Sequence, residues 1–414
     1  MNLKRRIVTG IATSAILLNV LTPIVFAETN VVISGNGAGS DNWANVTQSN
    51  TTTVTQNNTA NVTNNVDADA KTGDNDANFN TGGTVVVDTG KATVKADIVN
   101  TLNSNAAQVD CCAAGSTDVK ISGNGAYSDN GVKLDQTTTT AVRQNNVANV
   151  TNNVDADAET GENDANMNTG GDVMIVTGDA KVDTNISTTA NVNSTKVGSA
   201  LGASNPSASF VITGNGAGSG NYITAALAKV TSVSQNNVAN VTNNVDADAE
   251  TGENDANFNT GGDVIIGTGN ATVEADIDNA VNFNYADVDC GCTWDVLAKI
   301  AGNGAEPDFD RADNIITLTL NSLQAVGQGN LSNLRNDLKD LDAKTGKNDV
   351  ESNTGSVEGG DPAIVTGDAL VDTGVNNSGN VNVVGDLMGI DWPEMPNVEF
   401  SFNFAALWAF LHMG

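Results

Sequence analysis

Small or apolar residues alternate with polar ones at every second position over residues 54–70, the longest regular segment of the chain. Successive side chains of a β-strand point to opposite faces, so this alternation predicts one long strand with two unlike faces. The mostly apolar face carries Val54, Gln56, Asn58, Ala60, Val62, Asn64, Val66, Ala68 and Ala70. The polar face carries Thr55, Asn57, Thr59, Asn61, Thr63, Asn65, Asp67 and Asp69.

The same alternation predicts further strands over residues 92–102, 180–192 and 271–285. In the last of these, the pattern places Ala271, Ile277 and Phe283 on the apolar face and Asn282 on the polar face.

A helix competes with a strand in one place. Leu331, Leu334, Leu338 and Leu341 are spaced three and four apart, which is the spacing of one helix face. The equivalent segments elsewhere are rich in Asn, Thr, Val and Asp, which are poor helix formers. We therefore expect strands there and a short helix only at these leucines.

The chain is a tandem array. Residues 235–263 recur almost unchanged at 144–172 and at 56–84, and in eroded form around 330–355. Each repeat opens with a turn that contains Asn-Gly, at Asn36, Asn124, Asn215 and Asn303, and the period is about 90 residues. Thr-Gly pairs such as Thr72-Gly73 and Thr89-Gly90 mark predicted corners.

These patterns predict an all-β fold, a tandem-repeat parallel β-solenoid. Asparagines within the apolar column (Asn64, Asn152 and Asn243) suit such a fold, because stacked amides can bond one another. The alternative is an array of antiparallel β-sandwich modules, which the Asn-Gly turns favour. The expected divisions are a signal peptide (1–27), repeats at 28–115, 116–205 and 206–296, a degenerate repeat at 297–386, and an aromatic segment at 387–414.

The first 27 residues predict secretion. Lys4, Arg5 and Arg6 precede a long apolar run, which ends at a small-x-small cleavage site at Ala27. The alternative is an uncleaved anchor. The formal charge of the chain is −31, so we expect it to repel nucleic acid and anionic lipid, and to attract cations or basic partners.

Aromatic residues gather in the last segment, which includes Trp392, Phe400 and Trp408. The apolar run within this segment is too short to cross a membrane. Two interpretations remain open: a cap over the end of the array, as terminal repeats generally need, or a docking strand that anchors the chain to a cell envelope.

Clustered carboxylates are the best candidate for chemistry. Alternate residues of a strand share a face, and Ca²⁺ prefers many oxygen ligands, so these residues form a hypothetical calcium site in each repeat. The alternative is a solvated acidic edge that discourages edge-to-edge pairing. The candidates are Asp67, Asp69, Asp74, Asp76, Asp155, Asp157, Glu159, Glu162, Asp164, Asp246, Asp248, Glu250, Glu253 and Asp255.

Catalysis by these carboxylates is not expected. A catalytic site is normally built once, whereas this cluster occurs three times with no unique Lys, Arg or His beside it. The single histidine, His412, stands near the end of the chain. No catalytic or cofactor-binding residue is therefore assigned, and the chain is not expected to be an enzyme.

Four cysteines fall in two pairs, Cys111 with Cys112 and Cys290 with Cys292. An exported chain favours disulfides. The two pairs are separated by long stretches of repeat, so local bridges or bridges between subunits are the hypothesis, with a zinc site as the alternative.

Over residues 30–385 the chain resembles the repetitive β-strand surface proteins that bacteria secrete, through its leader, its Thr/Asn/Val/Gly-rich repeats and its acidity. Residues 54–60 (VTQNNTA) are similar to the Gln/Asn strand repeats of curli subunits, whose period is much shorter. The resemblance implies a structural or adhesin-like role at the cell surface. Two alternatives remain: a self-assembling fibre or surface-layer subunit joined through the aromatic segment, and a polysaccharide-processing β-helix enzyme.

Overall fold

The computed structural model describes residues 9–12, 16–21, 28–110, 116–198, 207–289, 295–305, 313–355 and 362–385. Within these residues the protein is built from strands and contains no helix.

The chain winds out and back four times, and each turn of the winding is one coil. Coil one consists of β3 (Thr29–Ser34), the long outbound strand β4 (Asp41–Lys71), and the return strands β5 (Val85–Asp88) and β6 (Ala92–Asp110). Coil two consists of β7 (Ser116–Ser122), β8 (Asp129–Glu159), β9 (Val173–Val176) and β10 (Ala180–Gly198). Coil three consists of β11 (Ser207–Thr213), β12 (Gly220–Glu250), β13 (Val264–Gly267) and β14 (Ala271–Asp289). Coil four consists of β15 (Asp295–Ala301), β16 (Asn314–Lys344), β17 (Ala363–Val365) and β18 (Ala369–Val384).

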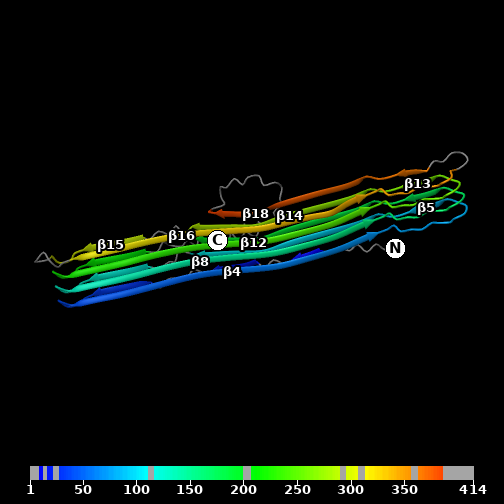
Figure 1. Ribbon diagram of the computed structural model, residues 1–414. Helices are drawn as coiled ribbons and strands as arrows, with labels where there is room; N and C mark the ends of the chain where they lie inside the picture. Colours follow the sequence, from blue (N-terminus) through cyan, green and yellow to red (C-terminus); the bar gives the residue numbers. More distant parts are fainter. Residues whose placement is uncertain are drawn as a thin grey trace.

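Equivalent strands of successive coils pair in parallel and in register. They form the sheets β4-β8-β12-β16, β6-β10-β14-β18, β3-β7-β11-β15 and β5-β9-β13-β17. The long strands run side by side along the whole molecule (Figure 1). With 31 residues each, they extend for about 100 Å. The prediction of a parallel β-solenoid is confirmed, and the alternative of antiparallel sandwich modules is wrong.

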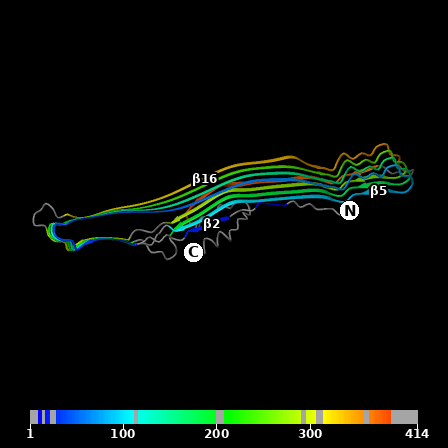
Figure 2. The ribbon, with the colours of Figure 1, turned by 90° about the horizontal axis from the view of Figure 1, so that it is seen from below.

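The outbound sheet packs against the return sheets as a second layer (Figure 2). Val66 of β4 lies in one core cluster with Val94 and Ile98 of β6, and Val54 lies in another with Ala107. The sheet β3-β7-β11-β15 covers the beginning of the outbound sheet, where Phe210 is fully buried. The predicted apolar face of residues 54–70 is therefore the core face.

Amide ladders run through this narrow core. Nδ2 of Asn64 donates to Oδ1 of Asn152 at 2.7 Å, and Asn152 donates in the same way to Asn243 at 2.7 Å. Asn152 and Asn243 are fully buried. Each of these amides meets its own kind one coil away, and backbone carbonyls and threonine hydroxyls supply further partners in the core, so most buried amides are hydrogen-bonded.

Glycines occupy the corners because the coils approach too closely there for a side chain. A Cβ on Gly161 would lie 1.7 Å from the carbonyl oxygen of Gly252. The hydroxyl of Thr160 donates to the carbonyl of Gly178 at 2.9 Å, which ties two Thr-Gly corners of one coil together. In the opening turns, the left-handed residue is the glycine before the asparagine, as at Gly35 with φ 70°.

Two details of the predicted strands are wrong. Residues 314–344 form the strand β16 throughout, so the leucines of the fourth repeat do not form a helix. In β14, Asn282 has φ 63° and is left out of the backbone pairing with β10, as at a β-bulge. This left-handed residue reverses the alternation, so Asn282 is fully buried and Phe283 is half-buried on the opposite face.

Two strands within the first 27 residues also belong to the described structure. β1 (Thr9–Ala12) and β2 (Ile16–Leu21) pair in parallel with β6, on the side away from β10.

Candidate functional site

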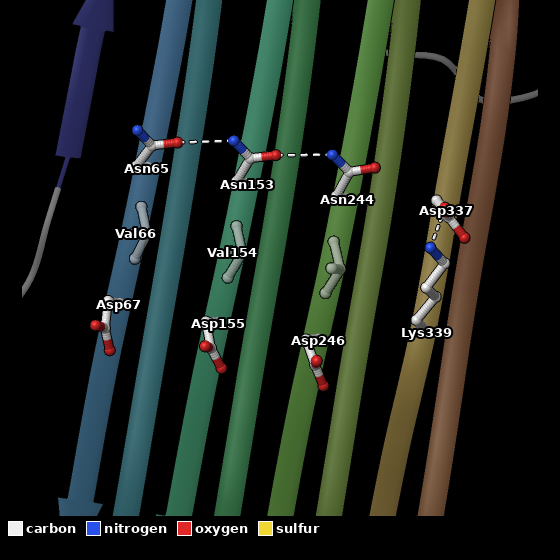
Figure 3. Close-up of a pocket in the computed structure, with 11 residues that line it drawn as sticks. Asn65, Val66, Asp67, Asn153, Val154, Asp155, Asn244, Asp246, Asp337 and Lys339 are labelled. Atoms are coloured by element: carbon white, nitrogen blue, oxygen red, sulfur yellow. Dashed lines mark hydrogen bonds and ion pairs between the residues drawn. The ribbon is translucent and has the colours of Figure 1, made fainter.

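A shallow groove of about 260 Å³ crosses the outward face of the long sheet, perpendicular to the strands (Figure 3). One side is the outward ladder of Asn65, Asn153 and Asn244, in which adjacent amides are bonded at 2.7 Å. The opposite side and the end at coil four are carboxylates and a lysine: Asp67, Asp155, Asp246, Asp337 and Lys339.

Parallel, in-register pairing turns each acidic position of the repeat into a column of carboxylates. Asp155 lies in register with Asp67 on one side and Asp246 on the other. Paired strands are about 4.8 Å apart, so like charges face one another along the groove. Two further columns are Asp69, Asp157, Asp248 and Asp342, and, at the tip, Asp76, Asp164, Asp255 and Asp349.

Burial and, after it, the crowding of carboxylates raise the pKa values of several residues in these columns. Burial, together with the charges of Asp155 and Asp248 above all, raises the pKa of Asp157 to about 6. Burial is also the main cause of the raised pKa of Asp248, and neighbouring carboxylates add to it. The pKa values of Asp164 and Asp255 are raised for the same two reasons. The columns therefore favour a bound proton or another positive charge.

Lysines neutralise the acidic surface in the first and last coils. Nζ of Lys71 lies 3.2 Å from Glu159 Oε1 and forms a second ion pair with Glu162. In coil four, Lys344 lies 2.9 Å from Asp342. Lys347 forms an ion pair with Glu253 of coil three.

The predicted acidic clusters do not close around a centre. Asp155, Asp157 and Glu159 follow one another along the outward side of β8, whereas Glu162 and Asp164 lie beyond it in the tip. The column carboxylates have their equivalents in adjacent coils as cross-strand neighbours, and Asp155 also acts on Asp157 along β8. Among the described residues, no three His, Cys, Asp or Glu side chains are grouped so that they could hold a metal ion.

Two oxygens in the columns do lack partners. Oδ1 of Asp248 and Oε1 of Glu250 are buried and accept no hydrogen bond in the described structure. Buried, unpartnered carboxylate oxygens are costly, so this part of coil three is where a proton or a cation would stabilise the protein most.

The sequence analysis missed the residues that coil four contributes. Lys339 lies in register with Asp246, and Asp342 in register with Asp248. Aligning the eroded fourth repeat with the third at an offset of 93 or 94 residues would have found them.

Some predicted features lie outside the described residues. These are Cys111, Cys112, Cys290 and Cys292, and the aromatic segment 387–414. In the part of the chain that is described, no helix has the length and apolarity that crossing a membrane requires.

The chain was compared with protein-family models, with curated proteins and with solved structures, and none of them matches.

Proposed function

We propose that this chain is a secreted, cell-surface structural or adhesin-like repeat protein that presents an elongated acidic sheet to a partner surface. The observation that carries the proposal is the outward face of the β4-β8-β12-β16 sheet. It repeats Asn, Thr and Asp in registered columns across a strand length of about 100 Å. A flat periodic array suits contact with an extended surface more than capture of a small molecule, for which concave pockets are the rule.

Electrostatics select the kind of partner. Columns of like charge at strand spacing create a strong local negative potential, which attracts a basic or cation-coated surface. Catalysis remains outside the proposal, because the acidic columns repeat from coil to coil and no unique general acid or base accompanies them in the described part of the chain.

Localisation is tested by fractionating the producing cells and treating intact cells with protease. We expect the chain in the medium or on the surface, where added protease removes it. A chain that remains in the cytoplasm, protected from protease, would contradict the proposal.

The role of the columns is tested by retention of the full chain on a polylysine-coated surface. A variant that removes four column charges (Asp155→Asn, Asp157→Asn, Asp246→Asn and Asp248→Asn) should be retained about fivefold less well. The control removes four outward charges elsewhere: Asp118→Asn, Asp135→Asn, Asp276→Asn and Asp278→Asn. Equal losses in both variants would show that net charge alone matters.

Calcium stabilisation belongs to the same proposal and is tested by thermal unfolding with and without millimolar Ca²⁺. A divalent cation between neighbouring carboxylates would relieve their repulsion, so we expect Ca²⁺ to raise the melting temperature by a few degrees, on the order of 1 kcal/mol. The variant with the four Asp→Asn substitutions in the columns should lose this shift in melting temperature, and the control variant should keep it. An unchanged melting temperature of the unsubstituted chain would exclude bound calcium.

A further inference from the structure

Both ends of the stack of coils present strand edges. In the described residues, no strand pairs with the outer edge of β4 in coil one or of β16 in coil four. The outer edge of β6 is paired only with β1 and β2, at residues 97–100 and 104–109. Unpaired edges are templates for another strand, and the pairing of β1 and β2 shows that this edge accepts strands in parallel.

The inward asparagine ladders have a direction. In each ladder the asparagine of one coil donates to the asparagine of the next coil in sequence, so the ladder that begins at Asn64 ends at Asn336 of coil four. Oδ1 of Asn64 therefore accepts no hydrogen bond in the described structure, while Asn336 has no further coil to donate to. The same direction holds for the ladders that begin at Asn36, Asn58, Asn75, Asn103 and Asn105.

The direction makes the two ends complementary. The glutamine ladder runs the opposite way, from Gln328 of coil four down to Gln56 of coil one. If coil four of one copy stacks on coil one of another, each of these ladders meets its continuation donor to acceptor, and the sheets continue in parallel. Two copies that met through their coil-one edges would place the acceptor ends of the inward asparagine ladders against one another, and two that met through coil four would do the same with the donor ends.

Charges at four registered positions also have opposite signs in coils one and four. The pairs that a head-to-tail contact would form are Asp67 with Lys339, Asp74 with Lys347, Lys91 with Asp368, and Lys95 with Asp372. The same pairing already occurs inside the chain, where Lys95 lies 3.2 Å from Asp183 and Lys91 forms an ion pair with Asp179.

Five positions would bring like charges together, and three of these repeat a contact that the protein already contains. The pairs are Asp69 with Asp342, Asp76 with Asp349, Asp41 with Asp313, Lys71 with Lys344, and, at the start of the coil, Glu28 with Asp295. The first two continue columns that are acidic in all four coils, and Asp41 already pairs with Asp129. Lys71 and Lys344 each face carboxylates of their own chain.

We propose that the edge of coil one binds the edge of coil four of a second copy of this chain, so that copies stack head to tail. Such a contact uses two different surfaces and does not close on itself, so it generates a filament. It would pair β4 and β6 with strands of 31 and 16 residues, and displace β1 and β2, which pair over only four and six residues. The inference does not depend on the proposed cell-surface role.

The test uses two charge-reversed forms of the full chain, each altered at one end. The first carries Asp67→Lys and Asp74→Lys in coil one, and the second carries Lys339→Glu and Lys347→Glu in coil four. Alone, each form would place like charges across the contact, and we expect the concentration for half-maximal assembly, measured by sedimentation velocity, to rise about tenfold or more. Mixed in equal amounts, each end finds an opposite charge, so the mixture should assemble as the unaltered chain does.

A matched control reverses two charges of the acidic columns one coil inward, Asp155→Lys and Asp157→Lys. Unlike Glu162, which forms an ion pair with Lys71 of coil one, these two residues are flanked by carboxylates in the adjacent coils. The control changes the net charge as the first form does and leaves the end untouched, so it should assemble normally. A second pair of forms, Lys91→Glu with Lys95→Glu and Asp368→Lys with Asp372→Lys, repeats the test on the return sheet if circular dichroism shows that a form of the first pair is unfolded.

Negative-stain microscopy should show filaments of the unaltered chain. The proposal is overturned if that chain stays monomeric at every concentration, which would instead favour a cap over coil four. Unimpaired assembly of each single form would also overturn it, as would a mixture that fails to regain assembly.

Discussion

At the scale of single residues, the corners of the coils require glycine, because no side chain fits where two coils meet. Gly73, Gly161, Gly252 and Gly346 form a column in which each α-carbon faces the next carbonyl oxygen. The Thr-Gly pattern predicted these corners. It could not predict how closely the coils approach there, because that distance depends on a neighbour 88 to 94 residues away.

The first prediction concerns Gly161→Ala. A Cβ there would lie 1.7 Å from Gly252 O, so the backbones of two coils must separate and several hydrogen bonds lengthen. We expect a loss of about 3 kcal/mol in the free energy of unfolding, measured by chemical denaturation. Gly327→Ala is the control, since a Cβ at Gly327 would meet nothing within 4 Å, and it should be neutral or slightly stabilising. Equal stability of both variants would contradict the close approach at the corner.

The second prediction concerns Asp157→Asn. The pKa of Asp157 in the folded protein, about 6, lies above the ordinary value of 3.8 for this carboxyl, so the folded state holds the proton more tightly than the unfolded state. The carboxylate therefore destabilises the fold above pH 6, and this penalty disappears as the pH falls toward 4. We expect the variant to gain about 1 kcal/mol at pH 7.5, after allowance for solvent screening, and nothing near pH 4.

Thermal unfolding across this pH range measures the difference. Asp118→Asn is the control, because its register neighbours Asn30 and Ser209 are uncharged. A gain that is the same at every pH would exclude repulsion within the column as its source.

At the scale of elements, alternation predicted the long outbound strands of the first three coils and the return strands β6, β10 and β14, with the core face of residues 54–70. The helix expected at Leu331 and Leu338 does not form, because β16 pairs in register with β12 over its whole length apart from one bulge. Pairing with an existing strand outweighs local spacing. The bulge at Asn282 was invisible for a related reason, since asparagine in an alternating pattern looks like any outward polar residue.

A third prediction follows from the bulge column. Asn191 has φ 65°, is fully buried, and donates to Val238 O at 2.7 Å and to Asn282 Oδ1 at 3.0 Å. Asn191→Ala should lower the free energy of unfolding by about 3 kcal/mol. The substitution leaves the Val238 carbonyl without this hydrogen bond and places alanine in a left-handed conformation. Asn149→Ala, which removes one link of a half-buried outward ladder, should cost under about 1 kcal/mol. Denaturant unfolding of both variants, side by side, is the measurement, and equal costs would contradict the role assigned to the bulge.

At the scale of the whole molecule, each coil is held by its neighbours, as in other solenoids. The acidic residues that coils one to three contribute to the candidate site were identified from the sequence, but Asp337 and Lys339 of coil four and the grouping of the site were not. Residues such as Asp155 and Glu162 are close in sequence and lie in different elements, whereas Asp155 and Asp246 become neighbours only through stacking. The site is formed by the registered stacking of successive coils, so the sequence of a single repeat does not predict it.

That register has a mechanical consequence. Residues 28 and 385 belong to the first and last coils of the stack, so a pull between them runs across the coils. It loads the inter-coil hydrogen bonds in sequence, from the end inward, as in peeling. With 88 to 98 residues between equivalent positions, each coil that comes free should lengthen the tether by about 300 Å. Single-molecule stretching should therefore record a few evenly spaced rips, and one rip for the entire chain would contradict coil-by-coil release. A protein anchored at one end and held by a partner at the other would then yield to sudden load in steps, dissipating the work while most of its coils stay folded.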